Sequence, residues 1–143
     1  MKTFALCSLC AVLAAAAFCA HSSDLTNLTI KDKSVRVEVA RDEAARSRGL
    51  MFREKLEENS GMLFVMDQSD LICMWMKNTL IPLSVAFIDE HGQILNIEPM
   101  QPQTLSLHCS KGAARFALEM NLDWFKKQNI GPGDRIEHLP SMK

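Results

Sequence analysis

Residues 83–97, with the sequence LSVAFIDEHGQILNI, carry the clearest structural signal in the chain. Two apolar runs, residues 83–88 and 94–97, flank the turn sequence Asp-Glu-His-Gly. Apolar runs of this length on either side of a polar turn that contains glycine are typical of a β-hairpin. The stretch therefore predicts two antiparallel strands and indicates a chain rich in β-structure.

Further strands are expected on both sides of this hairpin. Residues 35–39 and 116–120 alternate in hydropathy, which is the pattern of a strand with one buried face. Residues 62–66 form a short apolar run, and residues 71–76 form a continuous one. A continuous apolar run predicts a strand that is covered on both faces.

The remaining segments supply the ends of the fold and two helices. Residues 21–34 contain a polar lead-in up to residue 27, which we expect to be mobile, followed by a first short strand. Residues 42–48 and 121–126 each begin with a residue that can cap a helix, which predicts two short helices. Residues 131–139 begin with a Gly-Pro-Gly-Asp turn and lead into a last strand.

The order of these elements decides the expected fold class. Six or seven strands with two short helices lack the regular alternation of strand and helix that builds a parallel sheet. We therefore predict a compact α+β fold with an antiparallel, barrel-like β-sheet and two short helices. Residues 35–140 are expected to form it as a single domain, because their number suits one hydrophobic core.

The N-terminal segment predicts the compartment. Lys2 precedes an uncharged and mostly apolar run, residues 3–20, with small residues suited to signal-peptidase cleavage. The run is shorter than the roughly 20 consecutive apolar residues that span a bilayer, and no second run follows. We expect residues 1–20 to be a signal peptide, the mature protein to be periplasmic, and no transmembrane segment to remain. Lipidation at Cys19 is the alternative, although Phe18 stands where a lipoprotein signal prefers a small residue.

Charge and motifs limit the function classes. Cleavage after residue 20 leaves 123 residues and removes one of the 16 basic residues, Lys2. The mature chain then has 15 basic and 17 acidic residues, so its formal charge is −2, against −1 for the full sequence. Without a basic patch, nucleic acid is not an expected partner. The mature sequence has no glycine-rich phosphate loop, zinc-protease motif or paired CxxC, so we expect no cofactor. We expect a monomer whose partner is a small ligand or an envelope protein.

Five ordered sequence blocks resemble the domain of unknown function 192 family, over about residues 35–136. The blocks are RGLMFREKL at 48–56, GMLFVM at 61–66, CMWMKNTLIPLSVAFIDEHG at 73–92, ALEMN at 117–121 and GPGDRI at 131–136. The resemblance does not imply an activity. This chain departs from the usual family sequence at two places. Where the family commonly has Phe-Trp-Met, only Trp75 and Met76 match, and where it commonly has Asp, this chain has Ser84.

Trp75, inside the run 71–76, and Lys77 and Asn78, directly after it, are candidate ligand-binding residues. Lys77 and Asn78 follow an apolar strand and should surface at the rim of the sheet, where binding groups often lie. Trp75, which we expect to be largely buried, can offer a flat wall beside them. The alternative is structural, with Lys77 and Asn78 as turn residues that prepare Pro82.

Arg53 and Glu119 complete the predicted ligand-binding set. Their first expected use is structural: Glu119 in a late strand can pair with Arg48 or Arg53 and so hold the first helix to the sheet. A direct binding role for Arg53 and Glu119 is the alternative.

Cysteine and methionine residues suggest a further possibility. Cys73, Met74 and Met76 offer the soft sulfur ligands that select Cu(I). Packing is the competing interpretation, because methionine commonly fills gaps in cores. Cys73 and Cys109 are an even pair in an oxidising compartment, which permits a disulfide without placing the two within reach. His108 beside Cys109 does not predict a catalytic dyad, because neighbours in a strand face opposite ways.

Two function classes therefore remain, with a Cu(I)-handling protein that uses Cys73, Met74 and Met76 as a third, narrower alternative. The favoured one is a non-catalytic accessory protein of the cell envelope that binds a small ligand or partner near Trp75, Lys77 and Asn78. The other is an enzyme in the same cleft, with Lys77, Glu119 or Cys109 as the reactive group. An enzyme needs at least two titratable groups with perturbed pKa values in one pocket, whereas a binding protein needs shape and a few polar anchors.

Overall fold

The computed structural model describes residues 24–141. The predicted signal peptide, residues 1–20, and the alternative lipidation site at Cys19 lie outside this range. Across residues 24–141, no helix combines the length and the hydropathy that a membrane crossing needs.

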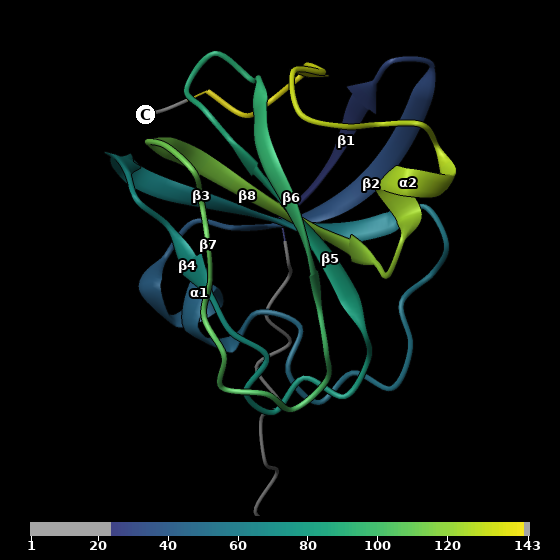
Figure 1. Cartoon of the computed structure of the whole chain (residues 1–143), viewed down its shortest axis with the longest axis vertical. Helices are drawn as coiled ribbons and strands as arrows, with labels where there is room; N and C mark the ends of the chain where they lie inside the picture. The colour runs from purple at the N-terminus through teal and green to yellow at the C-terminus, as the bar shows by residue number, and fades with distance from the viewer. Residues whose placement is uncertain (1–23, 142–143) are drawn as a thin grey trace, which may run out of the picture.

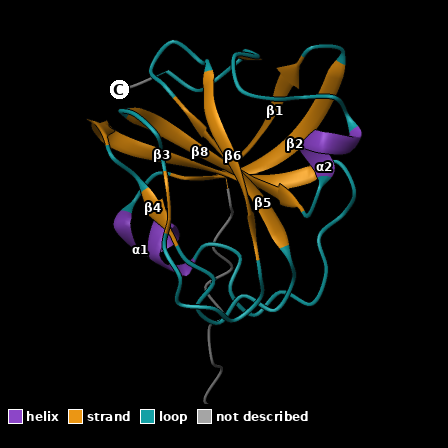
Figure 2. Cartoon of the chain, viewed as in Figure 1, coloured by secondary structure: helices purple, strands orange, loops and turns teal. Residues whose placement is uncertain are grey.

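The described chain forms nine strands and two short helices (Figures 1 and 2). Seven strands make one curled half-barrel sheet in the order β6-β5-β8-β3-β2-β1-β9, and β4 and β7 pair separately as a ribbon. The elements are β1 (Asp24–Ile30), β2 (Lys33–Ala40), α1 (Glu43–Arg48), β3 (Ser60–Asp70), β4 (Cys73–Met74), β5 (Leu83–Ile88), β6 (Ile94–Met100), β7 (His108–Cys109), β8 (Ala114–Asn121), α2 (Trp124–Lys127) and β9 (Ile136–Glu137).

The predicted fold class is confirmed, with one parallel pair inside an otherwise antiparallel sheet. Strands β2 and β3 run parallel. Parallel neighbours need a crossover connection, and α1 with residues 49–59 supplies it. The predicted hairpin is β5 and β6, whose turn is closed by Asp89: its Oδ1 accepts the backbone N–H groups of His91 at 2.9 Å and Gln93 at 2.8 Å.

The polar start of the described chain is a strand, so the prediction of a mobile lead-in up to residue 27 is wrong for Asp24 to Asn27. These residues form the first half of β1, where Asp24 pairs with Val39 and Asn27 with Arg36. The pairing of a strand depends on backbone groups, which polar side chains carry as well as apolar ones. Hydropathy alone therefore missed this half-exposed strand.

Two apolar cores lie on the two faces of the sheet. The first gathers Leu118, Met120 and Phe125 under α2 and the C-terminal segment. The second gathers Phe64, Phe87 and further apolar residues under α1 and the β4–β7 ribbon. In Figure 1, α2 stands at one side of the sheet and α1 with β4 and β7 at the other. Strands β5 and β8 are therefore covered on both faces.

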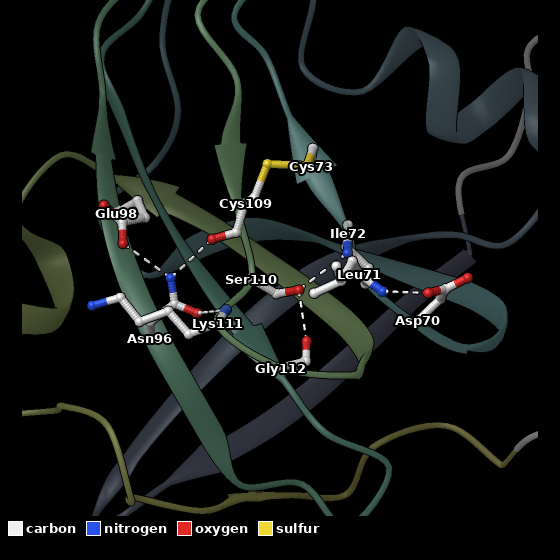
Figure 3. The surroundings of a disulfide bond; sticks show 10 residues. All are labelled: Asp70, Leu71, Ile72, Cys73, Asn96, Glu98, Cys109, Ser110, Lys111 and Gly112. Atoms are coloured by element: carbon white, nitrogen blue, oxygen red, sulfur yellow. Dashed lines mark hydrogen bonds between the residues drawn. A yellow bond between two sulfur atoms is a disulfide. The ribbon is translucent and has the colours of Figure 1, made fainter.

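A disulfide joins Cys73 to Cys109 across the β4–β7 ribbon, where the two are directly opposite each other (Figure 3). The run 71–76 was predicted to be a strand covered on both faces, and this is wrong. Only Cys73 and Met74 are in strand β4, and Leu71 and Trp75 are exposed. The ribbon lies over the sheet rather than within it, so only its inward side chains are buried.

Polar contacts fasten this ribbon to the sheet (Figure 3). The buried Asn96 amide donates to the carbonyl of Cys109 at 3.1 Å and accepts the N–H of Lys111 at 3.0 Å. The Ser110 hydroxyl accepts the N–H of Ile72 at 3.1 Å and donates to the carbonyl of Gly112 at 2.8 Å. Asn96 thus holds the β7 chain to β6, and the bond between Ser110 and Ile72 ties the β4 chain to the β7 chain.

The crowding at Gly61 gives a test of the packing of β3 against β8. A Cβ atom at Gly61 would lie 2.3 Å from the carbonyl oxygen of Glu119 and 2.5 Å from the sulfur of Met120. We expect Gly61→Ala to lower the free energy of unfolding by about 3 kcal/mol, because the clash involves backbone that cannot move aside. Urea denaturation measures this change.

The matched control for that substitution is Gly131→Ala. A Cβ atom at Gly131 meets no heavy atom within 4 Å. Its effect on the free energy of unfolding should stay within about 1 kcal/mol. Equal stability of the two variants would contradict the tight approach of β3 and β8.

Candidate functional site

Glu119 is an ionisable residue at the centre of the fold. It lies on β8, opposite Met62 of β3 and Val85 of β5. The neighbours Leu118 and Met120 face the first core, so alternation places Glu119 on the side of the second core. Only 4% of Glu119 is exposed.

No hydrogen bond or ion pair joins the Glu119 carboxyl group to the rest of residues 24–141, since desolvation is the sole cause of its pKa shift. Its oxygens still touch accessible space, because the Nε of Arg115 is the only fully buried side-chain N or O atom without a partner in the described chain. Burial alone raises the pKa of Glu119 to about 8. A carboxyl group with such a pKa is mostly protonated at neutral pH, and it can then donate a hydrogen bond. A perturbed carboxyl group of this kind is a recognised mark of a functional site.

The predicted pairing of Glu119 with Arg48 or Arg53 is wrong. Arg53 instead forms a two-pronged ion pair with Glu38 of β2, at 2.5 and 2.7 Å. The physical reason is the cost of burying a charge. Glu38 keeps 19% of its side chain exposed, so an ionised Glu38 stays partly hydrated, whereas an ionised Glu119 would lose nearly all contact with water. Arg48 is exposed and has no ion pair within the described chain.

A small cavity of about 30 Å³ has Glu119 in its wall. The C-terminal end of α1 and the segment after β4 enclose it, and Arg48, Trp75 and Thr79 also line it. About 10–15 Å³ of such space admits one water molecule, so the cavity fits a water or a small polar head group. Glu119, Arg48 and Thr79 therefore meet at one small space.

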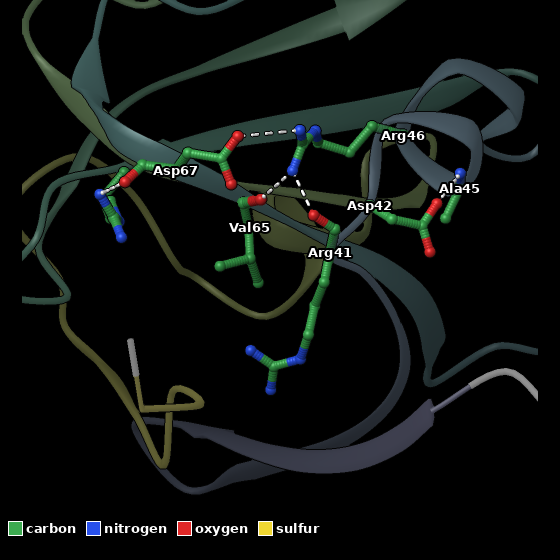
Figure 4. A network of polar contacts seen from close by, with 7 residues as sticks. Arg41, Asp42, Ala45, Arg46, Val65 and Asp67 are labelled. Atoms are coloured by element: carbon green, nitrogen blue, oxygen red, sulfur yellow. Dashed lines mark hydrogen bonds and ion pairs between the residues drawn. The ribbon is translucent and has the colours of Figure 1, made fainter. Parts of the chain in front are cut away.

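Rigid neighbours position these groups. Asp42 caps α1 by accepting the N–H of Ala45 at 2.7 Å (Figure 4). The Arg46 guanidinium donates to the carbonyls of Arg41 and Val65, the latter at 3.0 Å, and meets Asp67 at 3.2 Å (Figure 4). These bonds fix the helix to β2 and β3, so Arg48 projects from an anchored element.

Thr79 is held from the opposite side of the cavity. Its N–H donates to the carbonyl of Met76 at 3.1 Å, and its own carbonyl accepts the N–H of Gln103 at 3.0 Å. Thr79 is 5% exposed. Thr79 is not among the predicted site residues, and the only sequence signal for it is its place in the polar segment directly after residues 71–76.

A second, larger cavity of about 570 Å³ shares Arg48 with the first. Arg53 and Glu38 line it, together with Arg41 and Asp42. Its walls are mostly charged, and most of these charges already have partners within the chain. Arg48 is the cation that both cavities have in common.

The other predicted site residues lie at or near this place. Trp75 lines the small cavity, but it is 47% exposed, so the expectation of a largely buried indole is wrong. The Lys77 ammonium group lies 5.4 Å from the centre of the Trp75 ring, a cation–π contact. Asn78 has a left-handed backbone, and its carbonyl accepts the N–H of Phe52 at 2.9 Å. Neither Lys77 nor Asn78 lines the small cavity.

The alternative of a Cu(I) site at Cys73, Met74 and Met76 loses its thiolate to the disulfide. Cys73 is bonded to Cys109, so neither offers a thiolate to a metal or to a substrate. Met76 is fully buried in the second core, whereas Met74 borders the small cavity. Within residues 24–141, no three His, Cys, Asp or Glu residues gather closely enough to hold a metal ion.

The raised pKa of Glu119 predicts a pH-dependent stability. Between pH 4.5 and about 8 the folded chain keeps a proton that the unfolded chain releases, so stability falls as the pH rises through this window. Glu119→Gln removes this titration. The difference in the free energy of unfolding between the wild type and Glu119→Gln should therefore fall by an amount on the order of 4 kcal/mol as the pH rises from 4.5 to about 8. Urea denaturation at a series of pH values measures it.

The control for this experiment is Glu58→Gln, which makes the same chemical change at an exposed site. Its stability should follow the pH dependence of the wild type. A constant difference between wild type and Glu119→Gln at all pH values would contradict a buried neutral carboxyl group.

Comparison with known proteins identifies the family. The model of the DUF192 family, described as uncharacterized ACR, matches residues 26–138. A crystal structure of a candidate transcription regulator from Sinorhizobium meliloti 1021 is 34% identical, with a TM-score of 0.73 over 78% of this chain and 89% of that one. A crystal structure of a protein of unknown function from Novosphingobium aromaticivorans DSM 12444 is 28% identical, with a TM-score of 0.77. That match covers 82% of this chain and 88% of the other. No curated protein is significantly similar. The match to the family model spans most of the chain, and the protein belongs to the DUF192 family.

Proposed function

We propose that this protein is an exported cell-envelope protein that binds a small anionic ligand without catalysing a reaction. The observation that carries the proposal is the Glu119 carboxyl group, which has no bonding partner in the described chain and lies in the wall of a cavity that Arg48 also lines. Buried polar groups in proteins nearly always have a partner. A ligand that accepts a hydrogen bond supplies the partner that the chain itself lacks.

The chemistry of the lining groups selects an anion. A protonated Glu119 donates a hydrogen bond, and the Arg48 guanidinium adds donors and a positive charge. The Thr79 hydroxyl donates to the carbonyl of Lys77 at 3.4 Å, a long bond that an anion can replace. Carboxylate and phosphate oxygens accept from a protonated carboxyl group and from guanidinium, and guanidinium pairs with them especially well. The Trp75 indole supplies a flat apolar wall for the rest of the ligand.

Binding is favoured over catalysis because only one buried titratable group is perturbed at this place. The lowered pKa of Asp32 arises from a hydrogen bond with Lys33, and that of Asp134 from the N–H of Gly131, and both residues lie away from the cavity. The Sinorhizobium relative is described as a candidate transcription regulator. The balance of 16 basic and 17 acidic residues gives a nucleic-acid function no electrostatic support.

Acetate and inorganic phosphate are suitable first probes of the cavity. In a ¹H–¹⁵N NMR titration we expect saturable shifts of the Gly49, Thr79 and Glu119 amide signals. Arg48→Gln should weaken binding by roughly tenfold to a hundredfold, because a hydrogen bond to a charged group contributes about 1.5–3 kcal/mol. The affinity of the wild type should fall above pH 8 as Glu119 ionises and repels the anion.

Two controls separate this site from general attraction of anions. Arg36→Gln removes an exposed guanidinium group on β2 away from the cavity and should leave the affinity unchanged. Glu119→Gln keeps a donor that cannot ionise, so its affinity should not fall above pH 8. The absence of shifts at these three amides with both anions, or equal weakening by Arg36→Gln, would refute the proposal.

Export has its own test. The proposal rests on Lys2 followed by the apolar run of residues 3–20. N-terminal sequencing of the protein recovered from the periplasm should begin after Ala17, Cys19 or Ala20. Full-length protein in the cytoplasm would contradict export while leaving the ligand-binding proposal standing.

A further inference from the structure

The outward face of the β4–β7 ribbon is apolar and exposed. Leu71, Trp75, Leu105 and Leu107 are 67%, 47%, 65% and 66% exposed. Five of the seven exposed large apolar residues of the described chain lie in residues 71–80 and 103–112, which shows that they are concentrated there. A gathered apolar surface of this kind marks an interaction site rather than ordinary scatter.

The ribbon holds these side chains outward. Side chains two residues apart in a strand share a face, so Cys73 and Trp75 lie on one face of β4 and of the residues that continue it. Because Cys109 pairs with Cys73, Leu107 and Cys109 lie on this same face of the ribbon. The opposite side chains, Ile72 and Met76, are buried in the second core. The disulfide and the Asn96 and Ser110 hydrogen bonds stop the ribbon from turning over.

The charged residues within the ribbon segments themselves are all basic. Residues 71–80 and 103–112 include Lys77, His108 and Lys111 but no acidic residue, in a chain that has 17 acidic residues. Lys77 and Lys111 are exposed. The acidic residues Asp67 and Asp70 lie at one end of the ribbon, where they line a surface hollow with Leu71 and Cys73. The Asp70 carboxylate accepts the N–H of Leu71 at 2.7 Å (Figure 3). The ribbon thus combines an apolar strip with flanking cations.

We propose that this ribbon docks on an anionic phospholipid surface. Trp75, Leu105 and Leu107 enter the interface between head groups and acyl chains, and Lys77 and Lys111 contact lipid phosphates. Indole and leucine side chains beside lysine are the composition that interfacial segments use, and each lysine near an anionic surface strengthens binding. A second copy of the chain is a less favourable partner, because two identical faces in contact would place the lysine side chains of one copy against those of the other.

Tryptophan fluorescence reports this contact directly. Trp75 is 47% exposed and Trp124 is 3% exposed, so a change in solvent contact is a change at Trp75. Vesicles of phosphatidylglycerol and phosphatidylcholine should shift the emission to shorter wavelength and should carry the protein into the pellet on sedimentation. Vesicles with brominated acyl chains should quench Trp75, which tests insertion with the unaltered chain.

Matched variants test the roles of the residues. Leu105→Ser with Leu107→Ser should lower partitioning at least tenfold, and Lys77→Gln with Lys111→Gln should remove the preference for anionic over neutral vesicles. Leu25→Ser is the control, because Leu25 is also 47% exposed but lies on β1. Its partitioning should equal that of the wild type, and thermal melts should show that all variants are folded.

Three outcomes would overturn the docking proposal. The first is wild-type protein that stays in the supernatant with anionic vesicles, and the second is partitioning without quenching by brominated lipid. The third is a dimer in analytical ultracentrifugation that dissociates when Leu105→Ser and Leu107→Ser are introduced together. The anion-binding proposal at Glu119 is independent of all three outcomes.

Discussion

The central strand β8 must be covered on both faces, and the rest of the structure depends on this. It pairs with β3 on one side and β5 on the other, so its polar backbone groups are satisfied within the sheet. Its side chains then need two separate apolar covers. The fold supplies α2 with the C-terminal segment for one face and α1 with the β4–β7 ribbon for the other.

The second cover creates the candidate site because it consists of two separate pieces. A helix of six residues and a two-stranded ribbon do not close over the sheet as a continuous layer. The small cavity remains where the end of α1 meets the segment after β4, and Glu119 lies in its wall. Burial under this cover raises the pKa of Glu119, so one structural constraint produces both the cavity and its donor.

The ribbon has two faces with different consequences. Its inner face completes the second core through Ile72 and Met76. Its outer face leaves Trp75 and its leucine neighbours in solvent, close to the mouth of the cavity that Trp75 lines. The disulfide fixes the two chains of the ribbon to each other, so the inner packing and the outer surface cannot change independently.

The sequence by itself determined the class of fold, the hairpin of β5 and β6 and the first helix with its Asp42 cap, because these depend on local hydropathy and turn residues. It also selected Trp75 and Glu119 as candidate site residues. Only the tertiary structure decided that Arg53 pairs with Glu38, that Glu119 is left without a partner and that Cys73 meets Cys109. These outcomes depend on which strands lie side by side and how deeply each charge is buried, and neither property is encoded in local spacing.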